Sequence, residues 1–402
     1  MELLQDRLDV KNKTRANLFN WRGQFTPQFV DYILETFASS DDVIVDPFSG
    51  SGTVLLESAR KQLPCYGFEI NPAAYAMSKF FSLCNLSHND RIELSFSYKN
   101  KINKLVNSYD GLPIFTPQDS FRDSYRNLLQ FSRDLFSQTL TQREKLLAVN
   151  TLFAAEDYRN GDVVTTITKA VRYITDCLSH LPYTVKPIGA YLRDARLLNE
   201  YCPTPVDLIV TSPPYINVFN YHQNHRAIIE SLGWDILNIA HSEIGSNRKN
   251  RGNRFKTVVQ YCLDMELTLK AFWHSLRTYG TAIMVIGRES NVRKTPFYNG
   301  KMVGDIAQGL EAFSDVQNYT RTFSNKFGMD IKEDIIILKK TDTYPKDSIA
   351  RDVSARHLEA SLDTATEEAK RDIIDVLVCI DRIHPSPYLS SERDWLDDKD
   401  AS

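Results

Sequence analysis

Apolar residues follow two kinds of pattern near the start of the chain. Residues 29–37 place apolar side chains at helical spacing, and residues 42–46 form a short β-branched run typical of a buried strand. A glycine-rich turn comes next, followed by a helical pattern over residues 54–61. A second strand pattern then ends at Glu69, and helical spacing resumes over residues 73–84. This order of strand, turn, helix and strand predicts the opening of a doubly wound parallel sheet.

The strand pattern disappears in the middle of the chain and then returns. Between about residues 87 and 182 the apolar positions follow helical spacing, in a stretch rich in Asn, Ser, Lys and Arg. Beyond it, β-branched runs alternate again with helical and polar stretches. We predict strands over residues 188–194, 206–211, 281–287 and 334–338, helices over residues 222–232 and 258–276, and one amphipathic helix over residues 355–383.

Together these patterns predict an α/β fold, a doubly wound and mostly parallel sheet with a helical insertion. The insertion interrupts the sheet without being needed to complete it, so it is a candidate target-recognition region. The expected organisation is a first, cofactor half of the sheet domain over residues 1–86, a helical insert over 87–185, a second, catalytic half over 186–340, and a C-terminal helical tail over 341–402.

Composition narrows the class of protein. The 402 residues are 42% hydrophobic and 25% charged, as in soluble globular proteins, and no apolar run approaches the length of a membrane span. The first residues are polar, so we expect no leader and a cytoplasmic location. Six scattered cysteines without a C-x-x-C pair argue against a zinc site and a disulfide framework. The net charge of −3 means that any nucleic-acid contact must use local positive charge.

The first candidate for chemistry is the glycine-rich turn at residues 46–53, Asp-Pro-Phe-Ser-Gly-Ser-Gly-Thr. Glycines two apart at a strand-to-helix turn let the backbone approach a ligand closely. No Lys follows the second glycine, and the third glycine of a dinucleotide motif is absent, so ATP and a dinucleotide are disfavoured. The opening Asp46 suits a cationic or amine-bearing ligand, and Glu69 is placed to accept from ribose hydroxyls. An ordinary tight turn remains the alternative.

The second candidate is the sequence Ser-Pro-Pro-Tyr at residues 212–215, directly after a predicted strand. Two prolines fix the backbone, so the Ser212 hydroxyl and the nearby carbonyl oxygens become rigid acceptors. The aromatic ring of Tyr215 follows at once. Acceptors beside a ring suit a flat molecule that carries an amino group, although a plain loop is the alternative.

The two motifs together resemble those of the amino-group DNA methyltransferases. Residues 46–53 contain the F-x-G-x-G core of the family's cofactor motif, and residues 212–215 have the form of its catalytic tetrad that is typical of N4-cytosine enzymes. The resemblance covers roughly residues 21–85 and 186–340. It implies S-adenosylmethionine as cofactor. The residues that it implies for the cofactor are Phe25, Thr26, Asp46, Phe48, Gly50, Gly52, Thr53, Glu69, Ile70, Asn71, Asp194 and Ala195, and those for catalysis are Ser212, Pro213, Pro214 and Tyr215.

The resemblance also implies a mechanism. A cytosine leaves the duplex and stacks on Tyr215, its N4 amino group donates to Ser212 and a Pro213 carbonyl, and the methyl group is transferred directly in line. A carbon-5 enzyme would need a nucleophilic cysteine, and Cys65 precedes the strand-end acid rather than lying in a catalytic loop. N6-adenine is the near alternative. An RNA amino-group methyltransferase and a non-catalytic DNA-binding module are more distant ones.

Positive charge for DNA is concentrated in residues 247–256, which hold five cations and no acid. The composition favours contacts to phosphates with some reading of base edges, and a solvated loop is the alternative. We expect double-stranded DNA as partner, with any cognate restriction nuclease acting as a separate protein. The expected DNA-binding residues are Arg248, Lys249, Arg251, Arg254 and Lys256, and the candidates for the base pocket or strand path are Tyr221, His222, Asn224, His225 and Arg226.

Overall fold

The computed structural model describes most of the chain. The described residues are 3–11, 13–117, 123–158, 160–202, 205–216, 221–246, 250, 252–324, 328–389 and 396. Within these residues, no helix is long and apolar enough to cross a membrane.

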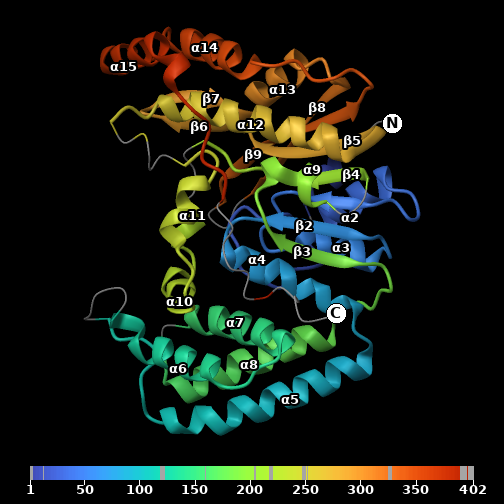
Figure 1. The fold of residues 1–402 in the computed structure, drawn as a ribbon, viewed down its shortest axis with the longest axis vertical. Helices are drawn as coiled ribbons and strands as arrows, with labels where there is room; N and C mark the ends of the chain where they lie inside the picture. Colours follow the sequence, from blue (N-terminus) through green and yellow to red (C-terminus); the bar gives the residue numbers. More distant parts are fainter. Residues whose placement is uncertain are drawn as a thin grey trace.

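The central element is a seven-stranded sheet with the order β3-β2-β1-β4-β5-β9-β8 (Figure 1). The strands from β3 to β5 are parallel, and β9 runs antiparallel to both β5 and β8. The strand order reverses between β1 and β4, and in open α/β sheets ligands bind at such a point. The predicted doubly wound, mostly parallel sheet is therefore confirmed. The strands are β1 Ile44–Asp46, β2 Cys65–Glu69, β3 Ile188–Leu192, β4 Val206–Thr211, β5 Leu276–Gly287, β8 Phe313–Ser324 and β9 Asp330–Lys340.

Both faces of the sheet are buried, because alternate residues of a strand point to opposite sides. In β5, Ile283 and Val285 belong to one hydrophobic cluster, whereas Ala282 and Met284 belong to the other. The helices that contribute to the first cluster include α2, α3 and α4, and α12 and α13 contribute to the second. Their bounds are α2 Pro27–Phe37, α3 Thr53–Arg60, α4 Pro72–Lys79, α12 Lys256–Ser275 and α13 Asn299–Gly309.

The segment between β2 and β3 is helical as predicted, and its helices α5 to α8 form the lower layer of Figure 1. Side-chain caps define where three of them begin, because Ser87, Thr141 and Asp162 each accept a hydrogen bond from a backbone N–H of the first turn. Asn150 connects this layer to the sheet domain by donating to the carbonyl oxygen of Ala76 at 3.0 Å. The helices are α5 His88–Val106, α6 Arg126–Ser137, α7 Gln142–Glu156 and α8 Val163–Ser179.

Several elements differ from the sequence-based expectations. The single helix predicted over residues 355–383 is wrong: the tail forms two helices, α14 Ile349–Ser361 and α15 Glu367–Val378. The break occurs because Thr366 caps a new helix by accepting from the backbone N–H of Ala369. The helix predicted over residues 222–232 is reduced to a 3-10 turn and α10 Arg226–Ser231. Elements not predicted are α1 Gln5–Asp9, α9 Leu198–Tyr201, α11 Ile236–Ser242, α13, β8 and the hairpin of β6 Glu289–Val292 with β7 Thr295–Tyr298.

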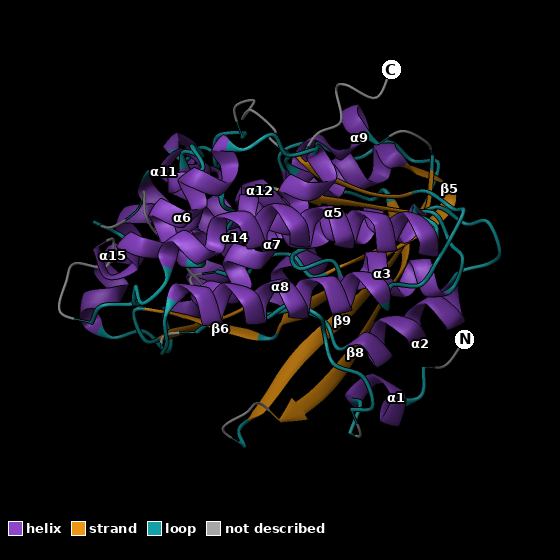
Figure 2. Ribbon diagram, turned by 90° about the horizontal axis from the view of Figure 1, so that it is seen from below, coloured by secondary structure: helices purple, strands orange, loops and turns teal. Residues whose placement is uncertain are grey.

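The β8–β9 hairpin projects beyond the rest of the sheet in Figure 2. Its outer strand β8 is covered near one end by the short helix α1, since Gln5 donates to the Thr320 carbonyl oxygen and Thr322 donates to Asp9. Covering an edge strand in this way removes unpaired backbone groups from solvent.

Candidate active site

The glycine-rich turn connects β1 to α3 and can be built only with glycine at its last position. Gly52 has a φ of +86°, and a Cβ atom there would lie 2.6 Å from the Phe81 ring and 2.8 Å from Cα of Ser78. Gly50 also has a positive φ, of +50°, and its backbone N–H donates to Glu69 at 2.9 Å. The turn thus brings the ends of β1 and β2 together around a hydrogen-bonded carboxylate.

Two carboxylates, Asp46 and Glu69, form what we call the acid pair. Asp46 is 2% exposed and accepts hydrogen bonds from the Thr211 hydroxyl at 2.6 Å and the Phe48 N–H at 3.2 Å. Glu69 accepts from the N–H groups of Gly50 and Asn71, each at 2.9 Å. Burial raises the pKa of both carboxyl groups to about 7. Neither carboxylate forms an ion pair with another described residue, so this part of the chain supplies no direct counter-charge.

The acid pair lies in the wall of a pocket that encloses about 990 Å³, including the part open to solvent. The structure brings together most residues predicted for the cofactor and the reaction. The predicted residues that line the pocket are Phe25, Asp46, Phe48, Gly50, Thr53, Glu69, Ile70, Asn71, Asp194, Ala195, Ser212, Pro214 and Tyr215.

Three predicted residues are not among those that line this pocket. Gly52 is packed against Phe81, and Pro213 is buried. Thr26 is the N-cap residue of α2 and lines a second cavity, between the segment before α2 and the helical layer.

Several pocket residues were not among those predicted for the cofactor. The Trp21 and Tyr221 rings are stacked, with centroids 6.1 Å apart and planes at 18°. Ser51 donates to Gln24 at 2.6 Å, which ties the segment before α2 to the glycine turn. In the sequence, only the aromatic residues of this segment could have indicated a place in the pocket. Residues 242–246 show no pattern that would have done so. The additional pocket residues are Trp21, Arg22, Gly23, Gln24, Pro47, Ser49, Ser51, Tyr221, Ser242, Glu243, Ile244 and Ser246.

The predicted tetrad follows β4 and holds Tyr215 firmly in place. The ring lies so close to β5 that a Cβ atom on Gly287 would be 2.6 Å from it. The Tyr215 hydroxyl lies 3.3 Å from the Ser212 hydroxyl and donates to Glu333 at 3.3 Å. Glu333 in turn accepts from Arg321 at 2.7 Å. Burial, together with the nearby Glu333 carboxylate, raises the pKa of Tyr215 well above its usual value, so its hydroxyl stays protonated.

The histidines beyond the tetrad have structural partners. His222 is buried and lies 2.9 Å from Glu243, and His225 lies 2.7 Å from Glu156 of the helical layer. The His225 ring also stacks on Phe153 with centroids 4.5 Å apart. The two contacts of His225 attach the region after the tetrad to the layer of α5–α8. Asn224 and Arg226 do not line the pocket, and Arg226 pairs with Glu230 at 2.8 Å.

The predicted DNA-binding segment is only partly described. Arg248, Lys249 and Arg251 lie outside the described residues. Arg254 is exposed and Lys256, the first residue of α12, is half-buried. Their placement does not test the predicted contact with DNA.

Cys65 lies in the sheet core rather than in the pocket. It is fully buried on β2, and burial raises the pKa of its thiol, which makes it unsuited to act as a nucleophile. Among the described residues there is no cluster of His, Cys, Asp and Glu that could hold a metal ion.

Comparisons with known proteins agree with this geometry. A family model for N6 and N4 methyltransferases, described as DNA methylase, matches residues 5–80, which include the glycine turn and Glu69. This part of the chain is similar to the amino-group DNA methyltransferases. A similar protein, the type II methyltransferase M.MjaII of Methanocaldococcus jannaschii, is 34% identical over 73 residues, or 18% of this chain and 14% of that protein. Another, the type II methyltransferase M.BsoBI of Geobacillus stearothermophilus, is 23% identical over 277 residues.

The match to M.BsoBI covers 56% of this chain and 54% of that protein, so the chain spans about half the length of this relative, and much less of M.MjaII. Among solved structures, a SAM-dependent methyltransferase of Methanosarcina mazei aligns with 77% of this chain and 97% of its own, with 10% identity and a TM-score of 0.34. The assignment of the sheet therefore depends on its own strand order.

S-adenosylmethionine is the cofactor of this family, and the pocket fits it. The acid pair offers negative charge and hydrogen-bond acceptors to a ligand that carries a sulfonium cation and ribose hydroxyls. Two further buried atoms of the wall, the Ser49 hydroxyl and the Asn71 side-chain nitrogen, have no hydrogen-bond partner among the described residues. Buried polar groups are ordinarily paired, so these atoms indicate a polar ligand in this pocket.

Proposed function

We propose that the chain is an S-adenosylmethionine-dependent DNA methyltransferase that transfers a methyl group to the exocyclic N4 nitrogen of cytosine in a specific DNA sequence. The observation that carries the proposal is the position of the tetrad. Ser212 and Tyr215 line the same pocket as the acid pair, at the reversal of the strand order. A base amino group and a bound methyl donor can therefore meet there.

Glu69 and Asp46 are proposed to bind different parts of the cofactor. Glu69 ends β2 and accepts from the ribose hydroxyls, as an acid at this position does in other nucleoside-binding sheets. Asp46 ends β1 and supplies negative charge for the cationic end of the ligand. When bound, the cofactor supplies the methyl group on a positively charged sulfur. The remaining members of the proposed cofactor site are Phe25, Thr26, Phe48, Gly50, Gly52, Thr53, Ile70, Asn71, Asp194 and Ala195.

The tetrad recognises the amino group of the target base. The Ser212 hydroxyl and the Pro213 carbonyl oxygen accept from the two amino hydrogens, which directs the nitrogen lone pair toward the methyl group. The Tyr215 ring supports the flipped base, and it cannot swing away because Gly287 and Glu333 hold it. Catalysis is then mostly positioning, without a covalent intermediate.

Double-stranded DNA is the proposed partner, and the enzyme would act in the cytoplasm with any cognate restriction nuclease as a separate protein. The basic segment at residues 247–256, with Arg248, Lys249, Arg251, Arg254 and Lys256, contacts the phosphates. The layer of α5–α8 is proposed as the target-recognition region. Arg254→Ala and Lys256→Ala should each lower the slope of log affinity against log salt concentration by about 1, measured by fluorescence anisotropy on duplex DNA.

Mass spectrometry of nucleosides tests the reaction. The protein is incubated with duplex DNA and methyl-labelled S-adenosylmethionine, and the DNA is then digested. We expect labelled N4-methylcytosine, lost in Ser212→Ala and in Tyr215→Ala. The matched control is Tyr344→Ala, which removes an exposed tyrosine far from the tetrad in sequence and outside the pocket lining. Labelled N6-methyladenine would overturn the choice of base. A labelled product in RNA alone, or none in any nucleic acid, would overturn the proposed function.

A further inference from the structure

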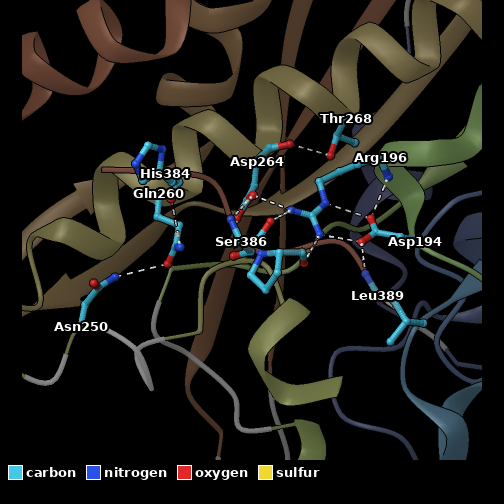
Figure 3. A network of polar contacts seen from close by, with 10 residues as sticks. Asp194, Arg196, Asn250, Gln260, Asp264, Thr268, His384, Ser386 and Leu389 are labelled. Atoms are coloured by element: carbon cyan, nitrogen blue, oxygen red, sulfur yellow. Dashed lines mark hydrogen bonds and ion pairs between the residues drawn. The ribbon is translucent and has the colours of Figure 1, made fainter. Parts of the chain in front are cut away.

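Residues 384–389, which we call the C-terminal strap, pass across α12 next to the end of β3 (Figure 3). Gln260 of α12 fixes the start of the strap by donating to the carbonyl oxygen of His384 at 3.2 Å. Asp264, also on α12, accepts from both the backbone N–H and the hydroxyl of Ser386, at 2.8 and 2.7 Å. The strap is thus anchored by specific hydrogen bonds rather than by loose packing.

The strap meets a guanidinium group whose five N–H donors are all used. The side chain of Arg196 is 0% exposed and donates to Asp194 through two nitrogens, at 2.9 and 2.5 Å, and to Asp264 at 2.7 Å. Its other two bonds go to backbone carbonyl oxygens of the strap, those of Ser386 at 2.6 Å and Pro387 at 2.9 Å. The strap therefore supplies two of the five acceptors that hold Arg196 in place.

Arg196 in turn fixes the carboxylate of Asp194. One oxygen of Asp194 accepts from the backbone N–H and Nε of Arg196, at 3.0 and 2.9 Å. The other accepts from Nη2, and its remaining contact is with the strap N–H of Leu389 at 3.4 Å. This last distance is long for a hydrogen bond, so the second oxygen can accept from a better placed donor.

Asp194 lies where the base of a nucleoside ligand would extend. In the register of the parallel strands, Glu69 of β2 pairs with Leu192 of β3, and Asp194 follows two residues later. Glu69, Asn71, Asp194 and Ala195 all line the same pocket. A nucleoside whose ribose is bound by Glu69 therefore directs its base toward Asp194.

We propose that Arg196 and the C-terminal strap are positioning elements for the cofactor, which orient the Asp194 carboxylate so that it accepts from the 6-amino group of adenine. This inference rests on the proposed function, in which S-adenosylmethionine occupies the pocket. The tail of the chain, nearly two hundred residues after β3, would then help to recognise the adenine of the cofactor.

Binding of two ligands to the full chain tests the proposal without catalysis. The probes are S-adenosylhomocysteine and its analogue with hydrogen in place of the 6-amino group, titrated by calorimetry. The variant Ser386→Ala/Tyr388→Ala removes a hydroxyl bound to Asp264 and a ring that lies 4.8 Å from the Arg196 guanidinium. We expect about fivefold weaker binding of S-adenosylhomocysteine and unchanged binding of the analogue, because only the former reports on the amino contact.

The matched control is Ser361→Ala/Tyr344→Ala, which makes the same two changes elsewhere in the tail, where the Ser361 hydroxyl donates to the Leu358 carbonyl oxygen of its own helix. Equal weakening of both ligands, or no weakening of either, would overturn the proposal. If the double variant fails to fold by circular dichroism, Tyr388→Ala alone is used, since that side chain is 46% exposed. A wild-type protein that binds neither ligand would overturn the proposed function and this inference with it, and that result is distinct from a loss confined to the variant.

Discussion

Two groups of buried acids lie beside the same pocket. Among the described residues, one group is paired with a cation and the other is not. Asp46 and Glu69, the acid pair, are held by hydroxyl and backbone N–H donors and have pKa values raised to about 7. Asp194 and Asp264, by contrast, share the guanidinium group of Arg196, although burial still raises the pKa of Asp264 to about 6. We call Asp194, Arg196, Asp264 and Ser386 the tail cluster.

The difference indicates what each group is for. Burying a charge without a partner is unfavourable, so a protein that retains two such carboxylates keeps them for a ligand. In the tail cluster the donors of Arg196 are paired with acceptors of the protein, so the cluster needs no ligand to be stable. Its role is to fix the orientation of the Asp194 carboxylate. The acid pair is therefore expected to control cofactor affinity, and the tail cluster to control stability and orientation.

The largest effect is expected from removal of the shared guanidinium group. Arg196→Met leaves Asp194 and Asp264 buried without a counter-charge, which should lower the free energy of unfolding by about 3 to 5 kcal/mol. Urea denaturation at pH 7.5 measures this. Arg288→Met is the control, because the Arg288 side chain is 35% exposed and its pairing with Asp334 should contribute less than about 1 kcal/mol. Equal losses in the two variants would contradict the distinction.

Neutralising a carboxylate of the acid pair should raise the free energy of unfolding instead of lowering it. The folded-state pKa of Asp46 is raised, so the stability associated with its protonated form is present at low pH and lost as pH rises through about 7. At pH 8 the ligand-free Asp46→Asn variant should therefore be more stable than the wild type, by about 2 kcal/mol, with a smaller gain at pH 5. The same variant should bind S-adenosylmethionine more weakly. Thermal unfolding at the two pH values tests the sign, and a loss of stability at pH 8 would refute it.

A third consequence is a pH-dependent affinity for the cofactor. As pH falls through about 7, Glu69 and Asp46 become protonated and lose negative charge and acceptor capacity. The dissociation constant of S-adenosylmethionine should rise by about tenfold between pH 8 and pH 6. Glu69→Gln should bind weakly throughout and show a shallower dependence, as measured by calorimetry. A wild-type affinity that does not vary over this range would show that the pair is not part of the site.

The sequence predicted the acid pair far better than it predicted the tail cluster. β1, β2 and β4 are largely buried, so they appear as apolar runs. The residues at or just after their carboxyl ends, Asp46, Glu69 and Ser212, could therefore be placed at one edge of the sheet. Strand β8 lies at the sheet edge, and its apolar residues are three or four positions apart instead of alternating, so its pattern did not indicate a strand.

The tail cluster could not have been predicted from spacing. Asp194 was expected in the pocket and does line it, but nothing in its neighbourhood shows that a helix 70 residues later and a strap 190 residues later meet at Arg196. Such contacts depend on how the helices pack rather than on local pattern. The pairing of Trp21 with Tyr221 is of the same kind, since it joins two loops that are distant in sequence.

The smallest expected effect concerns Tyr388, whose ring lies 4.8 Å from the Arg196 guanidinium at the surface of the tail cluster. Because Asp194 and Asp264 already balance the charge of Arg196, the ring should add little. Tyr388→Ala should lower the free energy of unfolding by about 0.5 to 1 kcal/mol, and Tyr388→Phe, which keeps the ring, should match the wild type. Chemical denaturation of both variants decides this. A loss as large as that of Arg196→Met would mean that the strap, rather than the two carboxylates, provides most of the stabilisation of Arg196. The two carboxylates would then not be sufficient to stabilise the buried guanidinium group.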